Sequence, residues 1–380
     1  DVHGIQLGQV WVLAGQSNIA HTIKVFRGQI DSNIAVPPVN SNVHMFDMNL
    51  DFGSSIKQSD VTEGHWSQCT ENTQENFSYT GYLFADQLQK ELNEPVAILQ
   101  TGTGGTYIAS WMSKSSFDTL GVPRQFLSTY VQYTTANKFA SGLYNAKVYP
   151  ISGYSASGFI WYQGEADNLI HENYAKALPT LIDNWREDWN VRRDENEDLP
   201  FLIVQLPRLN SQYQHIREVQ WFTQFTRPNV TTITSIDSGE AEDIHPSDKA
   251  VIADRLVGAA LSNVYGKPAV YRPPVYQSMT VEGNRVILTF RDVGEGLRGN
   301  ETLTAFEISA DAAPDTTGFT PAQAEIISEN QIAVWADGIT SPAAVRYAWS
   351  GYPEISVYNS DNIPLVPFRT NSVYSESTPF

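Results

Sequence analysis

The sequence predicts an α/β fold in which a parallel sheet is flanked by helices, followed by a β-rich C-terminal module. Through roughly the first two-thirds of the chain, short apolar runs alternate with stretches of three- and four-residue apolar periodicity, the pattern of strands alternating with helices. The last third has short β-like runs broken by Gly, Pro, Asn and Asp. A length of 380 residues favours about two domains, and we place them at residues 1–266 and 267–380.

The same patterns define the individual elements. The predicted strands of the first domain are Gln9–Ala14, Pro95–Thr101, Ser157–Tyr162, Pro200–Leu206 and Val230–Ile236. The predicted helices, each with an apolar stripe, are Tyr79–Leu92, Tyr174–Trp189 and Asp248–Val264. Within the second helix, Pro179 must kink the helix or mark its true start. The β-like runs of the module are Val275–Phe290, Leu303–Ile308, Gln331–Trp335 and Ala344–Trp349.

Composition limits the class of protein. Hydrophobic residues make up 41% of the chain, which is ample for a buried core. The net charge of −18 makes nucleic acid a poor partner, and no apolar run is long enough to span a membrane. The single cysteine, Cys69, excludes an internal disulfide framework. The acidic, aromatic-rich composition suits an exported enzyme, secreted or periplasmic.

Two polar residues follow predicted strands in a way that indicates acyl-transfer chemistry. Ser17, in the sequence Gly-Gln-Ser-Asn, comes directly after the first strand, and His245 follows the last strand after a short loop. In parallel sheets, ligands bind beyond the carboxyl ends of the strands, so the two residues are expected to meet. A serine hydroxyl needs an adjacent base, and imidazole titrates in the working range. A carboxylate close in sequence can hold the imidazole tautomer.

Donors for a developing oxyanion are also present after predicted strands. Gly104 and Gly105 lie in a glycine loop after the second strand, where backbone N–H groups can approach a substrate closely. Gln163, after the third strand, carries an amide that can donate in the same way.

No cofactor or metal is expected. The glycine loop does not have the spacing of a dinucleotide-binding fingerprint. The remaining histidines show no metal-ligand spacing and are expected to be surface or packing residues: His3, His21, His44, His65, His171 and His215.

Taken together, these blocks resemble the SGNH-hydrolase superfamily, and within it the sialate O-acetylesterase branch. The likeness covers nearly the whole chain. The matching motifs are GQSN, GGTYIASW at 104–111, YNAKVYP at 144–150, WYQGEADN at 161–168, FLIVQLP at 201–207, DIHPSDK at 243–249, AVRYAW at 344–349 and PFRT at 367–370. So many ordered matches are far more specific than any single motif.

The resemblance implies roles for these residues. Ser17 would be the nucleophile and His245 the base. The oxyanion hole would combine the Ser17 N–H, an N–H of Gly104 or Gly105, and the Gln163 amide.

For the acid and for the residues that contact the sugar, the resemblance leaves alternatives open. Asp243 is favoured as the acid that orients His245, because the motif in this branch is Asp-Ile-His-Pro. In the wider superfamily the acid stands at the position of Glu242, which is the second alternative. A backbone carbonyl is the third. Trp111 and Tyr162 are placed to pack on sugar or to belong to the core. Thr103 stands where relatives often have tryptophan, which would open the sugar subsite.

The expected function is therefore removal of O-acetyl groups from an acetylated carbohydrate, with sialic acid as the first substrate class. An acetylxylan or other hemicellulose acetylesterase is the alternative within the same class. A sialate carboxylate requires a cation, for which Arg27 and Arg208 are candidates. An alternative of another class is a non-catalytic carbohydrate-binding protein on a hydrolase fold. The sequence does not indicate an oligomeric state.

Overall fold

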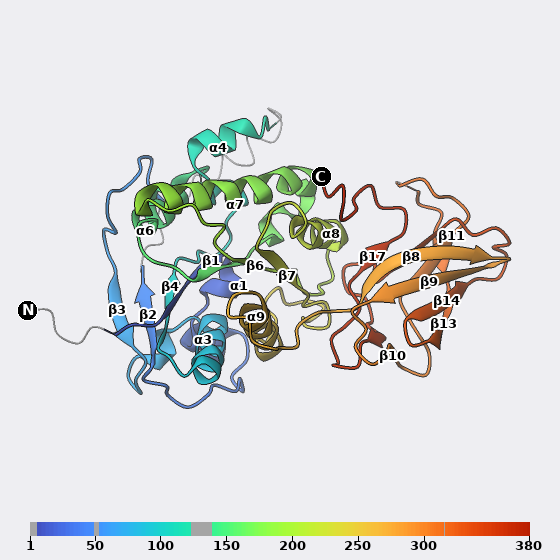
Figure 1. Ribbon diagram of the computed structural model, residues 1–380, viewed down its shortest axis with the longest axis horizontal. Coiled ribbons are helices and arrows are strands. Elements are labelled where there is room, and N and C mark those ends of the chain that lie inside the picture. Colours follow the sequence, from blue (N-terminus) through green and yellow to red (C-terminus); the bar gives the residue numbers. More distant parts are fainter. Residues whose placement is uncertain (1–5, 49–52, 123–138, 315) are drawn as a thin grey trace, which may run out of the picture.

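The computed structural model describes residues 6–48, 53–122, 139–314 and 316–380. In the N-terminal part of these residues, the chain forms a seven-stranded sheet in the order β3-β2-β4-β1-β5-β6-β7 (Figure 1). Its strands are β1 (Gln9–Gly15), β2 (Val43–Asp47), β3 (His65–Gln68), β4 (Val96–Gln100), β5 (Gly158–Tyr162), β6 (Phe201–Val204) and β7 (Val230–Ile233).

The central strand β1 brings the site together. It pairs in parallel with β4 on one side and with β5 on the other, with Leu13 opposite Gln100 and Gly15 opposite Tyr162. The loops that follow these three strands therefore begin at the same edge of the sheet. The predicted parallel pairing is confirmed for β2, β4, β1, β5, β6 and β7. The edge strand β3 runs antiparallel to β2, so the sheet as a whole is mixed.

Helices cover both faces of this sheet. Those described are α1 (Ser17–Ala20), α2 (Ile23–Gln29), α3 (Tyr79–Leu92), α4 (Lys114–Thr119), α6 (Tyr149–Ile151), α7 (His171–Arg193), α8 (Gln214–Thr223) and α9 (Ala250–Asn263). Short helical turns are η1 (Gln74–Asn76), η2 (Ile108–Trp111), η3 (Tyr144–Val148) and η4 (Glu165–Ile170). In Figure 1, α3 and α9 lie together on one face, and α7 and α8 lie on the other.

Large aromatic side chains fill the core between the sheet and α7. Trp161 of β5 lies edge-to-face with Trp111 and with Trp185 of α7, at ring-centroid distances of 5.9 and 5.8 Å. All three rings are fully buried, and edge-to-face packing of this kind is favourable. The apolar stripe of α7 is thereby fixed against β5.

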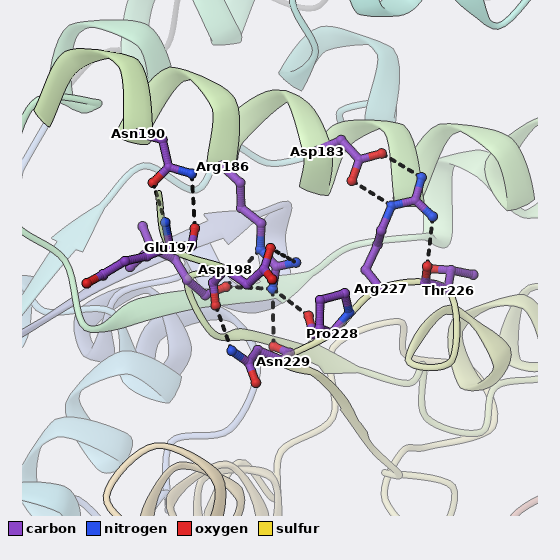
Figure 2. Close-up of polar contacts among 10 residues, drawn as sticks. Asp183, Arg186, Asn190, Glu197, Asp198, Thr226, Arg227, Pro228 and Asn229 are labelled. Carbon is purple, nitrogen blue, oxygen red and sulfur yellow. Dashed lines mark hydrogen bonds and ion pairs between the residues drawn. The ribbon is translucent and has the colours of Figure 1, made fainter. Parts of the chain in front are cut away.

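At the edge of the sheet where the strands begin, away from the loops that follow β1, β4 and β5, polar contacts hold α7 against the loops that lead into β6 and β7 (Figure 2). The buried Arg186 donates to the carbonyls of Leu199 and Pro228 at 2.7 and 2.8 Å. Arg227 forms a bidentate ion pair with Asp183 of α7. This end of the sheet is therefore closed by structural contacts.

The C-terminal part is built of antiparallel strands, as expected, and lies beside the α8 end of the first domain (Figure 1). Two four-stranded sheets, β12-β11-β15-β17 and β13-β14-β9-β8, enclose a separate apolar core within the described residues. The strands are β8 (Val275–Glu282), β9 (Arg285–Arg291), β10 (Arg298–Gly299), β11 (Phe306–Ser309), β12 (Thr320–Pro321), β13 (Gln323–Ser328), β14 (Gln331–Trp335), β15 (Ala344–Tyr347), β16 (Val357–Tyr358) and β17 (Phe368–Arg369).

The expected elements are present with small shifts of their ends. Helix α3 has the predicted bounds, and α7 extends beyond its predicted range and runs through Pro179. The predicted domain boundary at residue 266 falls between α9 and β8. Cys69 is buried and forms no disulfide.

Candidate active site

The nucleophile turn is shaped by Gly15, the last residue of β1. Its φ is +133°, and a Cβ atom here would lie 2.0 Å from the Tyr162 carbonyl oxygen of β5. Only glycine combines this backbone conformation with so close an approach. The next residue, Gln16, donates its N–H to the same carbonyl at 3.1 Å. Ser17 then begins α1, beyond the carboxyl end of the sheet.

Ser17 and His245 meet, although they lie 228 positions apart in the sequence. The Ser17 Oγ and His245 Nε2 atoms are 2.9 Å apart, the distance at which an imidazole accepts a hydroxyl proton. Burial lowers the pKa of His245 from 6.5, an effect that Asp243 opposes and Lys249 reinforces. The imidazole is therefore neutral, and able to act as a base, at neutral pH.

Of the two neighbouring carboxylates, that of Asp243 lies beside the imidazole. Its Oδ1 accepts the backbone N–H of His245 at 2.9 Å and is 3.4 Å from His245 Nδ1. Glu242 instead accepts a hydrogen bond from Asn210 at 3.1 Å. The Asp243 side chain is 47% exposed, so solvent screens its charge.

The glycine loop after β4 lies against the nucleophile turn. Thr103 donates its N–H to the Gly15 carbonyl at 2.9 Å. A Cβ on Gly104 would lie 3.6 Å from Ser17 Cβ, and Gly105 has a left-handed φ of +62°. Of the two glycines, Gly104 is therefore the one that lies against Ser17 in space, and Gly105 forms the turn that follows Gly104.

Gln163 lies in a different setting from the one expected. Its side chain is fully buried, and its amide nitrogen donates to the Thr106 carbonyl at 2.9 Å and to Asp167 Oδ2 at 2.6 Å. An amide nitrogen has two hydrogens, and both are occupied by these acceptors. In this conformation, therefore, Gln163 braces the glycine loop against η4 and does not offer an N–H to an oxyanion.

Comparison with known proteins agrees with this geometry. The family described as carbohydrate esterase, sialic acid-specific acetylesterase, matches residues 7–265. The chain belongs to this family. Sialate O-acetylesterase from Homo sapiens is 26% identical over 97% of this chain and 76% of its own length. The enzyme of that name from Mus musculus is 25% identical over 97% and 78%.

A solved structure supports the same assignment. The carbohydrate acetylesterase from Xanthomonas citri superposes with a TM-score of 0.80 and 28% identity, over 96% of this chain and 80% of that one. The chain is a carbohydrate O-acetylesterase, a carboxylic ester hydrolase.

Two residues expected near the sugar belong to the core of the esterase. Trp111 is fully buried and donates its indole N–H to Thr106 Oγ1 at 3.0 Å. Tyr162 is also fully buried, with the Lys249 ammonium 5.1 Å from its ring centroid. A ring without exposed surface cannot stack on a sugar, so in this conformation both residues follow the core alternative and neither contacts substrate.

Sequence reasoning missed a buried polar network behind the nucleophile. Lys249 Nζ donates to Asn18 Oδ1 at 2.6 Å, and the Asn18 amide donates to Glu165 Oε1 at 2.7 Å and to the Ile244 carbonyl at 3.0 Å. Burial raises the pKa of Glu165 to about 7 and lowers that of Lys249 to about 7. The network joins the nucleophile turn, the loop after β5 and the loop that carries His245.

His21 was expected to be a surface or packing residue, but it lies beside the site. Its ring centroid is 4.6 Å from that of His245. Burial, with repulsion from His245 and Lys249 when these are protonated, lowers the pKa of His21 to about 4, so it is neutral at neutral pH. It is the residue that immediately follows α1, and its backbone N–H donates to the Ser17 carbonyl at 2.9 Å. The signal in the sequence is its place four residues after Ser17.

Across the described ranges, no group of three or more His, Cys, Asp or Glu side chains is arranged to hold a metal ion. In those same ranges, no helix is long and apolar enough to cross a membrane.

Proposed function

We propose that this esterase removes O-acetyl groups from sialic acids through an acyl-enzyme formed on Ser17. The observation that carries the proposal is the 2.9 Å contact between Ser17 Oγ and His245 Nε2. His245 takes the hydroxyl proton as Oγ attacks the acetyl carbonyl, and then gives it to the departing sugar oxygen. Water activated by the same imidazole hydrolyses the acetyl-enzyme, releasing acetate and restoring both residues.

Asp243 is proposed to orient the imidazole. Its carboxylate lies on the Nδ1 side of His245, 3.4 Å away, and so favours the tautomer that leaves Nε2 unprotonated. The oxyanion is proposed to bind the backbone N–H groups of Ser17 and Gly104. Ser17 is at the first turn of α1, where backbone N–H groups have no partner within the helix.

A preference for sialic acid is supported by the family description and by the names of the relatives. The carboxylate of such a sugar needs a local cation, because the net charge of −18 gives no long-range attraction. Arg27 already pairs with Glu75. The Arg208 guanidinium lies 4.6 Å from the Tyr352 ring centroid, and its hydrogen bonds within the described residues, to the carbonyls of Gly239 and Pro353, are both 3.4 Å long. Arg208 is therefore the better candidate.

The same charge favours one alternative substrate class. A neutral acetylated hemicellulose meets no repulsion from a chain of net charge −18, whereas an anionic sugar does. Rates of acetate release from O-acetylated sialic acid and from acetylxylan, measured side by side at low and high salt, separate the two. The sialate proposal requires the higher kcat/KM on the acidic sugar, with a Ser17→Ala blank for spontaneous hydrolysis. A higher kcat/KM on acetylxylan would overturn it.

Export from the cytoplasm remains a proposal that rests on composition: 24 basic residues against 42 acidic, and 12% aromatic residues. Fractionation of the native cells, with antibody detection of this chain, tests it. Recovery only with cytoplasmic markers would contradict export.

A further inference from the structure

Three backbone segments are stacked at the carboxyl edge of the sheet, between the C-terminal module and His245. The outer segment is residues 350–353 of the module, which follow β15. The middle segment is residues 207–213, between β6 and α8. The inner segment is residues 238–245, which follow β7 and end at His245.

The outer and middle segments are in direct backbone contact. Leu209 donates its N–H to the Gly351 carbonyl at 3.0 Å. A Cβ on Gly351 would lie 1.8 Å from the Ser211 carbonyl oxygen and 2.6 Å from that of Leu209. These are backbone atoms that cannot rotate away, so any side chain at residue 351 must displace the middle segment.

The middle and inner segments are joined by a further set of hydrogen bonds. Asn210 donates its N–H to the Ala241 carbonyl at 2.9 Å and its side-chain amide to Glu242 at 3.1 Å. Arg208 donates its N–H to the Ser238 carbonyl at 3.2 Å. A shift of the middle segment therefore carries over to the residues immediately before His245.

A buried cation fixes the outer segment to α8. Arg217 is fully buried, and burial lowers its pKa to about 9. Its guanidinium donates to the carbonyls of Ser350 and Gly351, and to that of Tyr213 at the end of the middle segment. Nearby, Arg369 of β17 forms a bidentate ion pair with Glu218 of α8, at 2.9 and 2.7 Å. The module is thus held in one position relative to the middle segment.

We infer that the C-terminal module is a positioning part of the active site: through Gly351 and residues 208–211 it sets the place of residues 241–245, and hence of the His245 imidazole. The inference rests on the proposed role of His245 as the base. The Nε2–Oγ contact is within hydrogen-bond distance, and a misplacement of about 1 Å in a catalytic group can cost on the order of 10²-fold in rate.

The test compares two glycine substitutions in the full-length chain. Gly351→Ala introduces the backbone clash, whereas Gly318→Ala, also in the module, meets only ordinary contacts at 3.5 and 3.6 Å. Both variants are assayed at saturating and limiting concentrations of an acetyl chromogenic ester. We expect Gly351→Ala to lower kcat by on the order of 10- to 100-fold with little change in KM, and Gly318→Ala to match the wild type.

A second variant keeps the test decisive if Gly351→Ala does not fold. Asn210→Ala removes an exposed side chain and its hydrogen bond to Glu242 while leaving the backbone bond in place. It should lower kcat several-fold, again with KM nearly unchanged and the melting temperature near that of the wild type. A purely structural role would lower the melting temperature and leave kcat at 25 °C intact.

Two outcomes overturn the inference while leaving the proposed function standing: a folded Gly351→Ala enzyme with the kcat of Gly318→Ala, or, where that variant does not fold, an Asn210→Ala enzyme with wild-type kcat. Failure of the proposed function is distinguishable, because then the wild type itself would release no acetate or Ser17→Ala would retain activity.

Discussion

Lys249 Nζ lies 2.6 Å from Asn18 Oδ1, so a fully buried ammonium holds the residue that immediately follows the nucleophile. The same asparagine reaches the carbonyl of Ile244, next to His245. One side chain thereby ties together the two loops that supply the nucleophile and the base.

Lys249→Met should remove most of the activity and shift the pH profile. The Asn18 oxygen would lose its donor, and an unsatisfied buried polar group costs on the order of 1–3 kcal/mol. Because the Lys249 charge lowers the pKa of His245, its removal should move the acid limb of kcat/KM to higher pH. The measurement is kcat/KM from pH 4 to 8, with the exposed Lys24→Met as the control. An acid limb that stays in place would contradict the electrostatic part of this account.

The wild-type profile itself should fall on the acid side below pH 6.5. His245 must be unprotonated to accept the Ser17 proton, and burial lowers its pKa from 6.5, so activity persists until the pH falls through that lowered value. Asp243→Asn removes the charge that raises the pKa and should therefore move the limb lower still. An acid limb above pH 6.5 in the wild type would show that another group controls it.

Asp243→Asn should also cost more kcat than Glu242→Gln, because only the Asp243 carboxylate lies beside Nδ1. The loss should be smaller than the roughly 10⁴-fold seen in a triad with a buried acid, since Asp243 is 47% exposed. Steady-state kinetics of the two single variants decide the matter. Equal, small losses would indicate that the imidazole is held by the backbone instead.

Ser17→Ala should retain its melting temperature and lose on the order of 10⁴-fold or more in kcat, because nucleophile and base act as a unit. Ser155→Ala, an exposed serine on the loop before β5, is the matched control and should behave as the wild type. Near-normal turnover in Ser17→Ala would remove the assignment.

Gln163→Ala should chiefly destabilise the protein. The variant leaves the Thr106 carbonyl and the Asp167 carboxylate without the amide that donates to them, so the melting temperature should fall and both kcat and KM should change modestly. Thermal melts and steady-state kinetics check this. If kcat instead fell by on the order of 10²–10³-fold with unchanged stability, the loss would match that of an oxyanion donor, and Gln163 would return to that role.

Much of the fold was accessible from the sequence because apolar runs and periodic stripes mark buried strands and amphipathic helices. The elements that were missed carry weaker patterns. Strand β3 is mostly exposed and polar, and α8 buries Arg217, Glu218 and Gln220, whose polarity conceals their burial. Their partners lie in distant segments, so no local pattern reveals them.

In the site, the contact between Ser17 and His245 was predicted because each follows a strand that ends at the same sheet edge. The position of Asn18 and Lys249 was not, since their contact joins residues 231 apart. Gln163 was correctly placed after a strand, but the direction of its amide is set by Thr106 and Asp167. For Trp111 and Tyr162 the sequence leaves open both sugar packing and the core, because aromatic residues near strand ends serve either purpose, and only their burial separates the two.

The buried guanidinium of Arg217 bears on how this chain can be divided. Its acceptors at Ser350 and Gly351 belong to the module, while the arginine itself belongs to α8. If residues 1–266 were expressed alone, the Arg217 guanidinium would be exposed to solvent and would lose its two acceptors in the module. The ion pair between Arg369 and Glu218 would be lost as well. Fusing the sheet domain to a different module would leave Arg217 without the same two acceptors. The two domains are therefore best kept together in any truncation or redesign.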